Sequence, residues 1–221
     1  MKNFGKSFTC ILIACSTSSF FNASHASEKV KGLYGYGGLS YNRFTDFEGT
    51  VDSTKVDMQN SAAAGSTIGI GYDFGNTWKT DFSWYRTYGY YDKATVGAVS
   101  ADLTGRFQLN SFLIGVSKDL IEQGTSPKFT PYVGVGIGMG KLYSEKGLTV
   151  TVAGVSGTSG EIKGDYGFLY SLKGGIDYAV SKNNDIYGEV KWVGYNSDVE
   201  GEVATDSGGV IGVEIGYKWK F

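Results

Sequence analysis

The sequence contains little proline, cysteine and histidine, and this shortage narrows the classes of protein to which the chain can belong. Its 221 residues include 2 Pro, 2 Cys and 1 His, against 34 Gly, 16 Tyr and 13 Phe. No stretch approaches the roughly 18 consecutive apolar residues of a transmembrane helix. Abundant glycine and aromatic residues, with few helix formers, favour strands and turns.

The first 26 residues have the features of a targeting segment. The basic stretch "MKNFGK" precedes the short apolar run "SFTCILIAC", and Ser24 and Ala26 are small residues two positions apart. This pattern predicts a signal peptide over residues 1–26, cleaved after Ala26, and one domain over residues 27–221. A lipoprotein-like "LIAC" motif leaves a second route open, in which cleavage before Cys15 exposes that cysteine to lipidation, and a structural N-terminal helix is a third alternative.

Cleavage after Ala26 would leave a chain that lacks several kinds of chemistry. It would remove both cysteines, the only histidine and two lysines, leaving 18 basic and 22 acidic residues. The net charge near −4 argues against a nucleic-acid partner, and no disulfide framework is available. A zinc site of the usual kind and axial haem ligation by histidine are excluded, whereas haem ligation by tyrosine is not.

Apolar residues alternate with small or polar residues in eight stretches, and each stretch predicts a strand. The connections at 75–77 and 181–184 are tight, whereas the segments around 44–65, 89–105, 141–165 and 195–208 are longer and rich in Gly, Ser, Asp and Thr. Eight strands with this arrangement match an antiparallel up-and-down transmembrane β-barrel with short periplasmic turns and longer extracellular loops. The eight stretches are Leu33–Tyr41, Ser66–Phe74, Trp78–Tyr88, Arg106–Val116, Pro131–Gly140, Phe168–Tyr178, Ile186–Val193 and Gly209–Phe221.

The residues opposite the apolar face favour a membrane barrel over a soluble one. They are largely glycine in three strands, which would make a weakly held surface in water. In a membrane barrel, Ile70, Val135 and Ile215 face lipid, while small and charged residues fill an interior too narrow for a diffusion pore. The charges predicted for the interior are Asp81, Lys173, Asp177, Glu189, Lys191 and Glu214.

The C-terminal alternation continues to the last residue, with Tyr217, Trp219 and Phe221 on one face. A barrel has no free edge, so the last strand is expected to pair with the first along its whole length. With eight strands both termini lie on the periplasmic side, where the three aromatic residues would form part of the inner girdle.

Several stretches resemble small eight-stranded bacterial outer-membrane barrels of the opacity-protein and neisserial-surface-protein type, which share the OmpA-like barrel. These stretches are "FTPYVGVGIGMG", "GGIDYAV" with the following "DIYGEVKWV", and the terminal "YKWKF". The resemblance implies a multi-pass location in the outer membrane. It also implies that Phe221, Trp219 and Tyr217 are a recognition signal for the barrel-assembly machinery. Functions in this group diverge into adhesion, complement evasion and membrane anchoring.

We expect a non-enzymatic surface barrel that acts through its extracellular loops in adhesion, host interaction or envelope integrity, without a cofactor. Its expected partners are outer-membrane lipid and lipopolysaccharide, the barrel-assembly machinery and a host surface factor. One alternative is an enzyme acting on lipid A or phospholipid, but such barrels typically use a histidine base, which the processed chain lacks. The other is a surface receptor that binds a ligand or haem through tyrosines.

Two groups of charged residues near the long loops are candidate binding sites. A ring of cations where strands reach the loops would contact lipopolysaccharide phosphates, unless these are ordinary rim charges. Acidic residues in the first and last long loops would hold divalent cations or a basic partner, unless they are simply solvated. The cations are Arg43, Arg86, Arg106, Lys141 and Lys163, and the acids are Asp46, Glu48, Asp52, Asp57, Asp198, Glu200, Glu202 and Asp206.

The intact mass of the processed protein separates the two cleavage routes. We expect a mass that corresponds to residues 27–221 without modification. A mass that corresponds to cleavage before Cys15 with an attached diacylglycerol would contradict the signal-peptide assignment.

Overall fold

The structure is a computed structural model that describes residues 31–45, 47–51, 54–96, 99–121, 128–144, 149–152, 155–158, 162–196, 204–205 and 208–221. These residues form one antiparallel sheet, and all the elements assigned to them are strands. Among them there is no helix long and apolar enough to cross a membrane. The thirteen strands are β1 (Gly32–Phe44), β2 (Phe47–Val51), β3 (Thr54–Ser61), β4 (Ala63–Asp73), β5 (Trp78–Val96), β6 (Val99–Asp119), β7 (Phe129–Ser144), β8 (Thr149–Val152), β9 (Val155–Thr158), β10 (Ile162–Ala179), β11 (Asn184–Asn196), β12 (Ala204–Thr205) and β13 (Gly208–Lys220).

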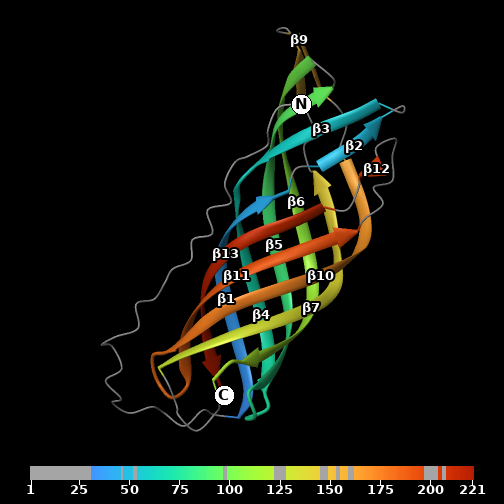
Figure 1. The fold of residues 1–221 in the computed structure, drawn as a ribbon. Coiled ribbons are helices and arrows are strands. Elements are labelled where there is room, and N and C mark those ends of the chain that lie inside the picture. Colours follow the sequence, from blue (N-terminus) through green and yellow to red (C-terminus); the bar gives the residue numbers. More distant parts are fainter. Residues whose placement is uncertain are drawn as a thin grey trace, which may run out of the picture.

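Eight of these strands close into a ring in the order β1-β4-β5-β6-β7-β10-β11-β13 (Figure 1). The first strand pairs with the last from Tyr34 opposite Lys220 to Phe44 opposite Val210, so the sheet has no free edge within the ring. All neighbours run antiparallel, as expected when consecutive strands are joined by turns. The predicted eight-stranded up-and-down barrel is confirmed.

The five remaining strands extend the sheet beyond the ring, and this is where the structure differs from the prediction. Most of the segment 89–105, predicted as a long loop, is strand: β5 continues to Val96 and β6 starts at Val99. This tall hairpin pairs with β3 on one side and with β8 on the other, while β2 and β9 pair with those strands in turn. Pairing across the hairpin gives hydrogen-bond partners to backbone N–H and C=O groups that would otherwise bond to solvent in this stretch rich in Gly, Ser and Thr. Figure 1 shows these additional strands at the end of the barrel opposite the C-terminus.

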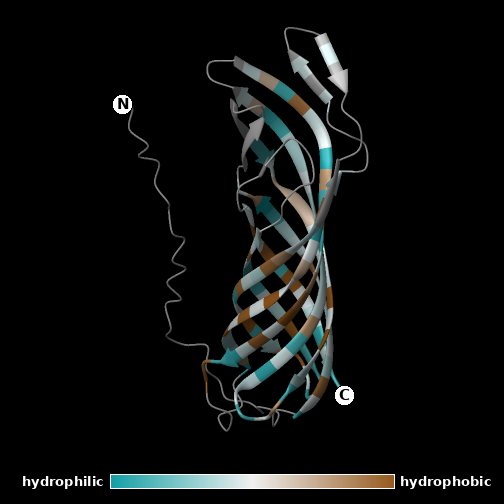
Figure 2. Ribbon diagram, turned by 90° about the vertical axis from the view of Figure 1, so that its right-hand side faces the viewer, coloured by the Kyte–Doolittle hydropathy of each residue, from teal (hydrophilic) through white to brown (hydrophobic). Residues whose placement is uncertain are grey.

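The ring strands present an apolar face to the outside. Ile70, Val135 and Ile215 are 63%, 57% and 66% exposed, as predicted for residues that face lipid. In Figure 2 the hydrophobic segments gather on the part of the ring away from the extended strands. An apolar surface that encircles a closed barrel is unfavourable in water and is solvated by the hydrocarbon of a bilayer.

A single arginine tests the assignment of the two faces. Val135→Arg is expected to lower the free energy of unfolding by about 2–4 kcal/mol, because it puts a charge on the lipid face of the barrel. Thr104→Arg is the control, because Thr104 is exposed on the part of β6 that pairs with β8, and it is expected to cost less than about 1 kcal/mol. Urea unfolding of the barrel in lipid vesicles measures both, and equal costs would contradict the assigned faces.

Candidate functional site

Ion pairs fill the end of the barrel interior that lies near the termini. Lys79 Nζ lies 2.8 Å from Asp119 Oδ1 and 3.0 Å from Asp177 Oδ2. Lys218 Nζ lies 2.8 Å from Asp177 Oδ1, so Asp177 is shared by two lysines. These side chains are nearly inaccessible to solvent. Buried charges are tolerated only when paired and hydrogen-bonded, and this cluster meets that condition.

A second group of ion pairs continues along the interior. Lys173 Nζ lies 2.9 Å from Asp81 Oδ2, and the Tyr36 hydroxyl donates a hydrogen bond of 2.8 Å to Asp81 Oδ1. Lys191 Nζ bridges Glu189 Oε1 at 3.1 Å and Glu214 Oε2 at 3.3 Å. Strands far apart in sequence therefore meet across the interior.

The structure places all six predicted interior charges on the inward face, namely Asp81, Lys173, Asp177, Glu189, Lys191 and Glu214. Sequence reasoning did not find the tyrosines that stand among them. Tyr132 donates to Glu189 Oε2 at 2.9 Å, and Tyr187 donates to Glu214 Oε1 at 2.5 Å. The inward glycines of the alternating stretches could have indicated these tyrosines, because they leave space for large side chains from neighbouring strands.

Inward glycines are needed where a tyrosine ring crosses the interior. A Cβ atom at Gly69 would collide with the ring of Tyr36, and one at Gly216 would collide with the ring of Tyr187. Both contacts join neighbouring strands. The glycines therefore leave the volume that the tyrosines occupy.

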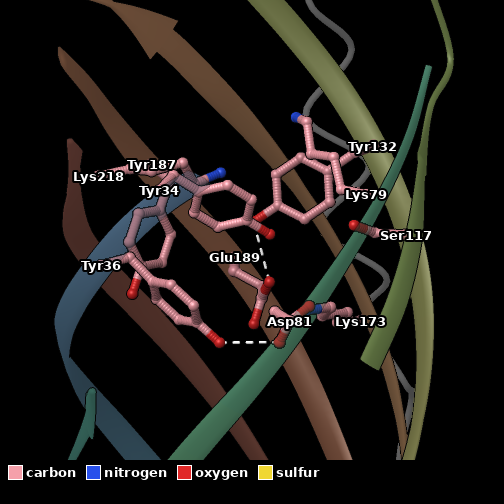
Figure 3. A pocket seen from close by; sticks show the side chains of 10 residues that line it. All are labelled: Tyr34, Tyr36, Lys79, Asp81, Ser117, Tyr132, Lys173, Tyr187, Glu189 and Lys218. Carbon is pink, nitrogen blue, oxygen red and sulfur yellow. Dashed lines mark hydrogen bonds and ion pairs between the residues drawn. The ribbon is translucent and has the colours of Figure 1, made fainter. Parts of the chain in front are cut away.

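Little empty space remains among these side chains. The cavity between them has a volume of about 20 Å³, enough for about one water molecule. Figure 3 shows its lining, with Tyr36 reaching Asp81 and a tyrosine hydroxyl reaching Glu189. Its lining also includes Tyr34, Lys79, Ser117, Tyr132, Lys173, Tyr187 and Lys218.

An apolar cluster fills the interior toward the extended strands. Phe44 and Phe107 pack edge to face with ring centroids 4.6 Å apart, and both are almost completely buried. The remaining buried members are Tyr85, Leu109, Leu113, Leu169, Val193, Tyr195 and Val210. The described interior is thus occupied by ion pairs near the termini and by apolar side chains toward the extended strands.

The outer face carries polar residues immediately beyond a row of large apolar ones. Cross-strand pairing aligns Trp84, Phe112, Met139 and Phe168 on β5, β6, β7 and β10, all exposed. Two residues further along each strand, the same pairing aligns Arg86, Asn110, Lys141 and Tyr166. The next row consists of Tyr88, Gln108 and Tyr143, and strand register sets Lys163 opposite Tyr143.

Hydrogen bonds connect the side chains of these two polar rows. Arg86 Nη2 donates to Gln108 Oε1 at 2.7 Å, and Gln108 Nε2 donates to the Tyr143 hydroxyl at 2.6 Å. Asn110 Nδ2 donates to the same hydroxyl at 2.9 Å. Gln108 is only 2% exposed, so the network is packed against the barrel.

Cations converge on aromatic rings in the same region. The guanidinium carbons of Arg86 and Arg106 both lie 5.0 Å from the ring centroid of Tyr88, and Lys141 Nζ lies 5.9 Å from that of Tyr166. We call this surface the outer polar patch and define it as Arg86, Tyr88, Arg106, Gln108, Asn110, Lys141, Tyr143 and Tyr166.

The five predicted cations do not form a ring. Arg86, Arg106 and Lys141 belong to the outer polar patch, and strand register sets Lys163 opposite Tyr143, beside the patch. Arg43 lies on β1, which β4 separates from β5, and it is exposed on the outer face. Arg86, Arg106 and Lys141 thus cluster on one side of the barrel, away from Arg43, and contact of the five cations with lipopolysaccharide phosphates stays a prediction.

The acidic loop residues have no common site among the described residues. Glu48 on β2 and Asp57 on β3 lie opposite each other, and the remaining six lie outside the part of the chain that the structure describes. In that part, no three His, Cys, Asp or Glu side chains are grouped as a metal site requires. The predicted signal peptide and Cys15 also lie outside the described residues.

The three C-terminal aromatic residues lie on the outer face of the barrel. Tyr217, Trp219 and Phe221 are 42%, 40% and 71% exposed, and the rings of Tyr217 and Trp219 lie 6.1 Å apart. The Phe221 amide donates to the Leu33 carbonyl at 2.9 Å, so pairing with the first strand reaches the last residue.

Removing one interior charge tests whether the ion pairs hold the barrel together. Lys191→Met is expected to lower the free energy of unfolding by about 3–5 kcal/mol, because it leaves Glu189 and Glu214 buried without their shared lysine. Adding Glu214→Gln should recover part of this loss.

Lys118→Met is the matched control for this substitution. Lys118 is exposed on the outer face of β6, where it lies over the Trp78 ring at 5.4 Å, and its loss should cost less than about 1 kcal/mol. Urea unfolding measures all three variants. Equal stability of the Lys191 and Lys118 variants would show that the interior pairs contribute little.

Comparison with known proteins identifies the fold. No protein-family model matches the chain, and no curated protein matches it in sequence. Neisserial surface protein A (NspA) is 17% identical, with 86% of this chain and 97% of that chain covered and a TM-score of 0.53. The outer membrane protein OprG from Pseudomonas aeruginosa is 14% identical, with 90% and 99% covered and a TM-score of 0.61. The chain therefore has the fold of the small outer-membrane β-barrels, and the predicted resemblance is confirmed at this level.

Proposed function

We propose that the chain is a non-enzymatic surface protein of the bacterial outer membrane that acts through its extracellular strands in adhesion, host interaction or envelope integrity. One observation carries this proposal: the described interior is filled, while the sheet continues beyond the ring. A filled barrel offers no route for solutes, so its functional surface lies outside.

The extended strands form a pre-ordered surface rather than a set of independent loops. β3 pairs with β5 and β8 pairs with β6, so both neighbours are tied to the tall hairpin. Thr95 and Ser100 hydroxyls lie 3.4 Å apart, and Thr151 and Ser156 hydroxyls lie 2.9 Å apart. A surface ordered before binding loses less conformational entropy when a partner binds, which favours a role in recognition.

The interior favours neither alternative function. The carboxylates Asp81, Glu189 and Glu214 each pair with a lysine, rather than facing an open pocket as a lipid hydrolase would need. The tyrosines beside them donate hydrogen bonds to those same carboxylates, which occupies the hydroxyls that a haem receptor would use. The first observation supports a non-catalytic role, and the second argues against haem ligation by these tyrosines.

We also retain the assembly role of the C-terminus as part of this proposal. Tyr217, Trp219 and Phe221 alternate on the outer face, and Phe221 is the most exposed of the three. Exposed aromatic residues at the end of the closing strand are accessible to an assembly factor before the ring closes.

Removal of an extracellular hairpin tests the proposal. The chain is displayed in the outer membrane of a heterologous Gram-negative host, and adhesion to cultured epithelial cells and resistance to detergent are measured. Replacing residues 145–161 by a short Gly-Asn turn, which removes β8 and β9, should reduce at least one of these activities severalfold.

Two controls accompany this experiment. A gel comparison of unboiled and boiled samples verifies that the shortened barrel is folded, and Lys182→Gln changes only an exposed residue in the turn at the opposite end. Planar bilayers containing the intact chain should show no steady conductance. Steady conductance, or activities unaffected by removal of the hairpin, would contradict the proposal.

A further inference from the structure

We propose that the barrel thins the outer membrane beside β4 and β5 and enriches lipids with short acyl chains on that side. The apolar face of the ring differs in height around the barrel, and this difference carries the inference. Adhesion by the extended strands plays no part in it.

The upper edge of the apolar face follows one row of cross-strand partners. Strand register aligns five large apolar residues on five neighbouring strands, and all of them are exposed. Two positions further toward the extended end, the same pairing aligns five polar residues. The apolar row is Ile68, Trp84, Phe112, Met139 and Phe168, and the polar row is Ser66, Arg86, Asn110, Lys141 and Tyr166.

This edge climbs toward the extended strands as it passes around the barrel. Strands that are tilted from the barrel axis make each row of partners oblique. A row that starts at Leu33 on β1 and is followed through every pairing of the ring returns to β1 at Arg43. Arg43 lies ten residues beyond Leu33 toward the extended end, so each row rises from β4 to β10.

The lower edge does not climb with the upper one, so the face is short on one side and tall on the other. The distance from the apolar row to the last exposed large apolar residue is six positions on β4 and β5, eight on β6, ten on β7 and twelve on β10. These last residues are Phe74, Trp78, Leu120, Phe129 and Val180.

The three remaining ring strands do not form a second short side. The exposed large apolar residues extend over eight positions on β1, from Leu33 to Tyr41, and over ten from Ile211 to Phe221 at the end of β13. β11 is short, but it lies between β10 and β13, which are both tall. β4 and β5 are therefore the adjacent pair of ring strands with the shortest apolar face.

Strand geometry converts these positions into heights. With a rise of about 3.3 Å per residue and a tilt of about 40°, each residue adds about 2.5 Å of height. The apolar face is therefore about 15 Å tall at β4 and β5 and about 30 Å tall at β10. The hydrocarbon of a bilayer is about 30 Å thick, so the tall side matches it and the short side does not.

Cations bound the short side at both edges. Arg86 follows Trp84 on the outer face of β5, and a hydrogen bond to Gln108 holds its guanidinium group. At the lower edge Lys118 is exposed on β6, with its Nζ 5.4 Å from the centroid of the Trp78 ring. Contact between charged side chains and hydrocarbon is costly, so both lipid surfaces are expected to curve inward beside these residues.

Tilting of the whole barrel does not remove the difference in height. β4 and β10 lie four strands apart in the ring of eight, so they face opposite sides. A tilt raises one side and lowers the other, but it leaves the length of each apolar stretch unchanged. The bilayer itself must become thinner beside β4 and β5. Lipids with short acyl chains fit a thin bilayer without compression, so we expect them to collect there.

The test compares the lipids on the two sides by quenching of tryptophan fluorescence in vesicles that contain the folded chain. One reporter keeps Trp84 and carries Phe at the other three tryptophan positions. The second reporter has Phe at all four positions and carries Phe168→Trp. The quenchers are phosphatidylcholines with dibrominated chains of fourteen or eighteen carbons, each diluted equally into unbrominated eighteen-carbon phosphatidylcholine.

At Trp84 we expect the fourteen-carbon lipid to associate at least about twofold more strongly than the eighteen-carbon lipid, because it fits the short side. The Phe168→Trp reporter should show no preference for the fourteen-carbon lipid, because it reports on the tall side. Each reporter is compared with itself, so a difference in depth between the two tryptophans does not enter the ratio.

Raising the upper edge on the short side should abolish the preference. Ser66→Leu with Arg86→Leu, made in the Trp84 reporter, lengthens the apolar stretch of β4 and β5 and should bring the ratio close to one. Lys141→Leu is the matched control, since it removes a cation of the same row on β7, and it should change the ratio at Trp84 less than about 1.5-fold. If the double variant does not fold, Ser66→Leu alone should lower the ratio in part.

Three results would overturn the inference: the same preference at both reporters, a preference for the eighteen-carbon lipid at Trp84, or equal effects of the double variant and Lys141→Leu. Adhesion of displayed cells is measured separately, so failure of the proposed function is distinguishable from failure of this inference.

Discussion

Everything else in the structure depends on the closure of the sheet between β1 and β13. In hydrocarbon no water is available to backbone N–H and C=O groups, so a sheet can span a bilayer only when its first and last strands pair. Here the pairing runs from Tyr34 opposite Lys220 to Phe44 opposite Val210, and the Phe221 amide extends it to the chain end. Closure in turn defines an inside and an outside, and thus where each alternate residue must go.

An eight-stranded ring is narrow enough for side chains to fill, and the chain fills it in two ways. Near the termini, lysines and carboxylates from distant strands pair, with tyrosines lying over inward glycines. Toward the extracellular end, aromatic and aliphatic residues replace the charges. Because the described interior is occupied, we place the proposed contacts with other molecules on the outer face or on the extended strands. The outer polar patch and the tall β5–β6 hairpin are the features available for them.

Local alternation was sufficient to predict the ring strands, their two faces and the closure, since a period of two is readable from neighbouring residues. The upper part of the β5–β6 hairpin was missed because Gly, Ser and Thr in 89–105 mask the alternation. This segment is nevertheless strand, since β5 pairs with β3 and β6 pairs with β8. Interior charges were identified by type, but their partners were not: Asp81 and Lys173 are 92 residues apart, and strand register decides which interior charges meet. In the outer polar patch the sequence likewise indicated the cations but not Gln108 and Tyr143. These two residues are brought together by the register between β6 and β7.

Disulfide cross-linking across the closing seam tests this account most directly, because the expected mature chain contains no cysteine of its own. Leu39 and Ile215 lie opposite each other on the outer face, whereas Val213 lies two residues along the same strand. In folded barrels from the outer-membrane fraction, Leu39→Cys with Ile215→Cys should form an intramolecular disulfide on oxidation, and Leu39→Cys with Val213→Cys should form far less. A folded barrel in which the first pair stays reduced, or in which both pairs bridge equally, would contradict closure in this register.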